Sequence, residues 1–115
     1  IPENEWKYAA APGGIANTTT GVTLAAAGGA GLSVYITSMQ LRSETLGNPT
    51  EIVLRDGAGG TVLWRSKINS NGMDLTNILF ENPIKGTANT LLEFATLIAT
   101  GTGTIYINAQ GYYAP

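Results

Sequence analysis

The sequence predicts an all-β domain of about eight short antiparallel strands, arranged as a jelly-roll-like sandwich or a barrel. Apolar residues alternate with polar ones along most of the chain, which is the period of a strand and not of a helix. Clusters of Gly, Asn and Pro interrupt this alternation at short intervals and mark turns. The chain has 115 residues, and domains cluster at about 100–150 residues, so we expect one β domain over residues 1–115.

The N-terminal part of the chain is predicted to form two strands. The first covers residues 5–10, carries Trp6 and Tyr8 on one face and ends at a Pro-Gly-Gly turn. The second is a Thr-rich strand over residues 15–26, and a glycine cluster at residues 28–31 ends it. Because glycine disfavours helix, this cluster excludes a long helix here.

A longer strand with a bulge is predicted for residues 32–42. Its apolar side chains change from one face to the other between Ile36 and Met39. One extra residue in a strand produces such a change, so we expect a bulge near Thr37 and Ser38.

The strongest local signal is a hairpin in the middle of the chain. Residues 51–55 and 61–68 form its strands, and the glycine-rich turn at residues 56–60 joins them. We expect Val62 and Trp64 to lie on one side of the second strand, with Trp64 in the core.

The C-terminal part completes the set with three strands. After a polar loop at residues 69–74, a strand over residues 75–80 is expected to stop at Asn82-Pro83, because proline cannot donate to a sheet ladder. Residues 91–98 and 104–112 form the last two strands, separated by a Gly-Thr-Gly turn.

The low charge of the chain excludes several partners. Charged residues make up 12% of the sequence, about half the usual share, and the net charge is -2 with only six Lys and Arg. Such a chain has no extended positive field to attract phosphate or anionic lipid. No apolar run approaches the ~20 residues of a membrane span. We therefore expect neither nucleic acid nor membrane as a partner.

The sequence shows no group of residues that is typical of a catalytic or metal-binding site. The chain contains no Cys and no His, which removes thiolate chemistry and the commonest general base and zinc ligand. The acidic residues are scattered, and no spacing forces two carboxylates together as glycoside hydrolysis requires. The glycine clusters lack the context of a phosphate loop. The sequence predicts no enzyme, no cofactor and no metal site.

Glu93 is the one acidic residue in an apolar setting. It lies within residues 91–98, where both faces of the predicted strand are apolar. An unpaired buried charge is costly, so we expect Glu93 to pair with Arg42, Arg55 or Arg65. Strands that are apolar on both faces suggest burial by the core on one side and by a neighbouring subunit on the other.

Aromatic residues are the remaining candidates for function. They are enriched in protein interfaces, and exposed ones can also stack on sugars. Tyr106 is expected to face away from Ile105 and Ile107. The candidate interface residues are Trp6, Tyr8, Leu91, Glu93, Tyr112 and Tyr113.

Several segments carry a resemblance to known proteins. They are Trp6-Lys7-Tyr8-Ala9-Ala10, Gly13-Gly14-Ile15, residues 25–31, Tyr35-Ile36-Thr37-Ser38, Leu54-Arg55-Asp56-Gly57, Thr61-Val62-Leu63-Trp64-Arg65, residues 83–90 and Asn108-Ala109-Gln110-Gly111-Tyr112. Over nearly its whole length the chain resembles a family of small virion proteins of tailed bacteriophages. The segments at residues 83–90 and 108–112 are the most specific.

The resemblance implies a structural component of the virion, assembled in the host cytoplasm. The expected role is a decoration or cement protein that binds the head as a symmetric oligomer; the alternative is a receptor- or glycan-binding module of a tail or fibre. The expected partners are the chain itself, as a homotrimer, and the major capsid protein or other virion proteins. Residues 1–8 are the candidate for an arm that reaches the shell, with Trp6 as its apolar anchor.

Overall fold

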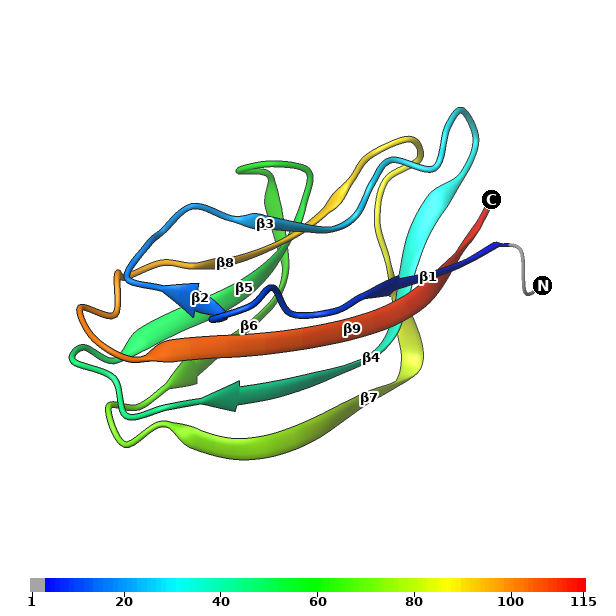
Figure 1. Cartoon of the computed structure of the whole chain (residues 1–115). Helices are drawn as coiled ribbons and strands as arrows, with labels where there is room; N and C mark the ends of the chain where they lie inside the picture. Colours follow the sequence, from blue (N-terminus) through cyan, green and yellow to red (C-terminus); the bar gives the residue numbers. More distant parts are fainter. Residues whose placement is uncertain (1–3) are drawn as a thin grey trace.

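The computed structural model describes residues 4–115 and consists of two antiparallel sheets packed face to face (Figure 1). Sheet A has the order β1-β9-β4-β7, with β2 also paired to β9, and sheet B has the order β3-β8-β5-β6. The strands are β1 (Glu5–Tyr8), β2 (Ile15–Ala16), β3 (Val22–Ala25), β4 (Ser33–Ser43), β5 (Thr50–Asp56), β6 (Thr61–Ile68), β7 (Met73–Lys85), β8 (Leu92–Thr96) and β9 (Thr104–Ala114). The predicted all-β sandwich is confirmed.

The N-terminal part contains one more strand than we predicted. Residues 15–26 form two strands, β2 and β3, and not the single strand that we expected. Asn17 directly after β2 has a left-handed backbone with φ of 42°, which ends the strand and lets the chain cross from sheet A to sheet B. With β1 and β2 counted together, the connections are those of an eight-stranded jelly roll.

The predicted bulge in β4 is present. Its register against both β7 and β9 shifts between Ile36 and Ser38, so Thr37 is the extra residue. Ile36 and Met39 consequently both point inward, and both are buried. This shift determines which side chains β4 presents on its outer face.

The hairpin of β5 and β6 is also present, but one detail of our prediction was wrong. Leu54 pairs with Trp64 and Arg55 pairs with Val62, so a bulge at Leu63 separates the two residues of β6. Val62 and Trp64 therefore point to opposite sides. Trp64 is half-buried against the core, where its ring meets Phe80 edge-on at a centroid distance of 6.4 Å.

The predicted stop at Asn82-Pro83 was wrong, because β7 continues to Lys85. Ile84 lies opposite Ile36 and Leu79 lies opposite Ser38, so a large bulge at residues 80–83 faces a single residue of β4. In addition, β7 is the edge strand of sheet A. A proline is tolerated at a bulge on an edge strand, because no ladder hydrogen bond is required of it there.

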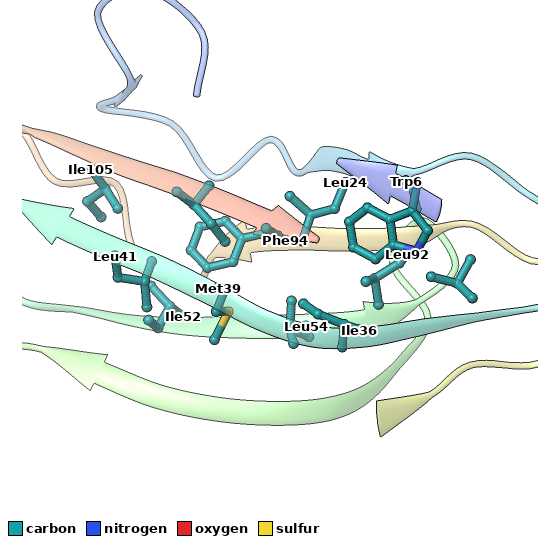
Figure 2. Packing of buried hydrophobic residues seen from close by; sticks show 14 of the residues in the cluster. Trp6, Leu24, Ile36, Met39, Leu41, Ile52, Leu54, Leu92, Phe94 and Ile105 are labelled. Carbon is teal, nitrogen blue, oxygen red and sulfur yellow. The ribbon is translucent and has the colours of Figure 1, made fainter. Parts of the chain in front are cut away.

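The core lies between the two sheets, and side chains from both point into it (Figure 2). Phe94 on β8 and Ile36 on β4 are fully buried, with Leu54 and Ile105 beside them in the same cluster. The alternation that identified the strands in the sequence is thus the alternation between this core and the two outer faces.

The candidate arm is part of the fold where the structure describes it. Glu5–Tyr8 is strand β1, paired antiparallel with β9, and Trp6 is only 8% exposed. Trp6 therefore anchors β1 to the core and is not available as the anchor of a free arm. Residues 1–3 lie outside the described part of the chain.

Candidate functional site

The outer face of sheet A is built from short rows of side chains that cross the strands. One row runs from Leu79 on β7 through Ser38 on β4 and Gln110 on β9 to Lys7 on β1. The next row runs from Asn77 through Gln40 to Asn108. These rows form the floor and walls of an open hollow of about 550 Å³, which we name the sheet A groove. Its outward-pointing lining consists of Lys7, Ser38, Gln40, Asn77, Leu79, Asn108 and Gln110.

Aromatic side chains flank the groove because of the same register. Tyr35 and Tyr112 lie opposite each other on β4 and β9, and their rings stack with a centroid distance of 4.8 Å and an interplanar angle of 9°. Lys85 Nζ lies 5.6 Å from the centre of the Tyr35 ring, and the Tyr35 hydroxyl donates to the carbonyl oxygen of Pro115 at 2.8 Å. Tyr106 faces outward beyond Asn108, as predicted, since Ile105 and Ile107 are buried.

Carboxamides dominate the groove. Asn108 Oδ1 accepts a hydrogen bond from the backbone N–H of Ala10 at 2.9 Å, which holds this side chain in place. The amides of Gln40, Asn77 and Gln110 have no hydrogen-bond partner within residues 4–115. The groove therefore presents neutral donors and acceptors to solvent.

The outer face of sheet B has a different character, because its arginine and glutamate side chains form ion pairs. Arg55 Nε donates to Glu93 Oε1 at 2.8 Å, and the same oxygen accepts from the backbone N–H of Gly59 at 3.0 Å. Arg65 pairs with Glu51 at 2.6 Å. The predicted ion pair of Glu93 is confirmed with Arg55 as its partner, whereas its place at a subunit contact stays a prediction.

The structure explains why both faces of the strand predicted at residues 91–98 are apolar. All five residues of β8 are buried, with Leu92 and Phe94 in the core and Glu93 only 8% exposed on the other side. Gly21 lies so close to the Glu93 side chain that a Cβ there would clash with it. This chain alone buries both faces of β8, so the neighbouring subunit that we inferred from the pattern is not needed.

Most of the candidate interface residues contact their own chain. Trp6 is buried, and Tyr8 and Tyr113 are partly buried against the core. The Tyr113 hydroxyl donates to the carbonyl oxygen of Ala26 at 2.8 Å, and burial raises the pKa of Tyr113 above its ordinary value. The carbonyl oxygen of Leu91, just before β8, accepts from the N–H of Gly57. Tyr112 is the candidate that lies on the outer face of sheet A.

Two exposed leucines were missed by the sequence reasoning. Leu79 is 81% exposed and Leu75 is 57% exposed. They share the outward side of β7 with Asn77, since alternate residues of a strand point the same way. Their spacing was visible in the sequence, but only the position of β7 at the edge of sheet A shows that nothing in the described part of the chain covers them.

Several acidic residues of the described part serve the fold. Asp56 accepts from the backbone N–H of Thr87, and Glu44 accepts from that of Thr104. Within residues 4–115, no three acidic side chains gather into a group that could hold a metal ion. The described residues also contain no helix that could cross a membrane.

No protein-family model matches this chain, and no curated protein matches its sequence. The resemblance to small phage virion proteins therefore stays a prediction from the residues.

Proposed function

We propose that the chain is a non-catalytic structural protein of a tailed-phage virion, a decoration or cement protein that binds the head as a symmetric oligomer. The resemblance over nearly the whole sequence supports this role. So does the low charge, since a protein that covers a shell needs complementary surface and not a reactive pocket.

The observation that carries the proposal is the exposed leucine pair on β7. An edge strand offers unpaired backbone groups to another chain, and exposed apolar side chains on it add to such a contact. Leu75 and Leu79 combine both features, because β7 pairs with β4 alone among the described strands. We assign β7 as the contact between copies, and three copies suit the three-fold positions of an icosahedral shell.

Oligomerisation also explains how the protein binds the head firmly through contacts that are individually weak. Three linked copies bind the head at once, and the second and third contacts form at raised effective concentration. Each copy then needs only modest affinity for the major capsid protein.

The test is the mass of the purified protein by light scattering. We expect a mass near three protomers for the native chain and a monomer for the double variant Leu75→Ser/Leu79→Ser. The matched control is Val62→Ser, which removes an exposed apolar side chain from β6, the edge strand of sheet B, and should leave the mass unchanged. A native chain that is monomeric at micromolar concentration would contradict the assembly model, and failure of the full-length chain to bind undecorated heads would contradict the decoration role.

A second function is favoured by the sheet A groove. The alternative that the sequence left open, a receptor- or glycan-binding module of a tail or fibre, requires an exposed site lined by polar and aromatic side chains. Polar side chains line the groove, and Tyr112 lines the smaller hollow that adjoins it at Gln110.

A further inference from the structure

We propose that the sheet A groove binds a neutral oligosaccharide. This inference rests on the second candidate function above, for which it names the class of ligand, and it does not depend on the decoration role, since a head, tail or fibre protein could each carry such a site.

The dimensions of the groove suit a short sugar chain. Its volume of about 550 Å³ lies within the range of about 300–1,000 Å³ that is usual for ligand sites. A second hollow of about 250 Å³, lined by Thr37 and Tyr112, adjoins it at Gln110, which lines both. An extended ligand of more than one sugar ring fits these two adjoining hollows better than a single ring does.

The chemistry of the lining matches hydroxyl groups. Each carboxamide supplies both a donor and an acceptor, and each sugar hydroxyl can take either role. Gln40, Asn77 and Gln110 come from three adjacent strands, so their amides can meet successive hydroxyls along one ligand. Lys7 is the one charged side chain in the lining, and no Arg is present to form the paired contacts that carboxylate or phosphate groups prefer. These features favour a neutral sugar over an acidic one.

Tyrosine rings supply the apolar part of the site. Sugar rings present C–H groups on their faces, and ligand sites combine aromatic surface with a few placed polar groups. The stacked Tyr35 and Tyr112 rings hold each other in position, and Tyr112 lines the smaller hollow beside the groove.

The same features argue against a second copy as the occupant. A dry contact with a second copy would bury the three free amides, and any amide left there without a hydrogen-bond partner would weaken the contact. A hydroxylated ligand supplies those partners. Leu79 lines the groove but Leu75 does not, so a contact between copies can form around Leu75 on β7 without filling the groove.

The experiment has two parts. The purified chain is first applied to an array of neutral and acidic glycans, and the best neutral oligosaccharide is then titrated into labelled protein while backbone amide resonances are followed by NMR. We expect shifts confined to Gln40, Asn77, Gln110 and their neighbours. Gln40→Ala and Gln110→Ala should each weaken binding about three- to tenfold, which is the loss expected for one hydrogen bond. Asn69→Ala, an exposed carboxamide in the loop between β6 and β7, is the matched control and should bind as the native chain does.

Three results would overturn the proposal. They are an array without a neutral ligand, shifts that map outside the groove, and groove variants that bind the sugar unchanged. If Gln40→Ala and Gln110→Ala instead change the mass of the oligomer, the groove belongs to a contact between copies. Leu75→Ser alone tests the assembly model separately, because Leu75 does not line the groove, so failure of one proposal can be told from failure of the other.

Discussion

Gly111 shows how one residue joins the core to the outer face of sheet A. It lies on β9 between Trp6 of β1 and the bulged part of β4. A Cβ at this position would clash with the Tyr35 carbonyl oxygen and would lie 2.8 Å from Trp6 Cζ2. The missing side chain lets the indole cover the strand and lets β4 approach. The stacked Tyr35 and Tyr112 rings depend on this approach.

Gly111→Ala should destabilise the protein by about 1–3 kcal/mol, the usual cost of overpacking. The reason is steric, because the contacts are backbone and a packed indole and neither can move freely. Chemical denaturation measures the effect, with Gln110→Ala as a control that should change stability by less than about 0.5 kcal/mol, since this side chain is exposed. Equal stability of both variants would mean that β4 and β1 shift easily at this point.

At the scale of elements, the sequence predicted the features that follow from the alternation of apolar and polar residues and from the residues at turns. The bulge at Thr37 and the hairpin of β5 and β6 followed from a change of apolar phase and from a glycine-rich turn. The continuation of β7 past Pro83 could not follow, because only its edge position removes the need for a ladder hydrogen bond. The bulge at Leu63 was equally hidden, since Val62 and Trp64 fit a regular strand.

The candidate site was less predictable than the fold for a physical reason. Gln40, Asn77 and Gln110 are far apart in the sequence and come together only because β4 lies between β7 and β9. Exposed carboxamides carry no periodic signal of their own. The aromatic residues that the sequence did single out, Trp6 and Tyr113, are held by the core of the same chain.

Strand β1 is expected to be essential to stability and not a dispensable arm. Deletion of residues 1–8 removes the pairing with β9 and takes Trp6 out of the core, and loss of a buried Trp side chain alone costs about 3–5 kcal/mol. We expect a large fall in melting temperature, measured by circular dichroism. Lys7→Ala, which changes only the outward side of the same strand, should melt as the native chain does. An unchanged melting temperature after the deletion would restore the arm interpretation.

For the whole molecule, the outer faces of the two sheets differ in the side chains that they expose. Sheet B pairs its Arg and Glu side chains with each other, so these charges need no outside partner. Sheet A leaves neutral amides, tyrosine rings and two leucines toward solvent. Both proposals therefore concern sheet A, with the leucine edge for copies of the chain and the groove for a sugar.

The two sheets should nevertheless unfold as one unit. The first and last strands pair with each other, and every sheet combines strands from both halves of the chain, so neither sheet can form from one half alone. The shared core makes each sheet the cover of the other.

Tryptophan fluorescence can follow the two sheets separately. Trp6 reports on sheet A and Trp64 on sheet B, so Trp64→Phe and Trp6→Phe leave one reporter each. In urea, the fluorescence transition of each variant should coincide with its own circular dichroism transition, as two-state unfolding requires. If the fluorescence of either variant changes at lower urea than its circular dichroism, the corresponding sheet opens first and the domain is not a single cooperative unit.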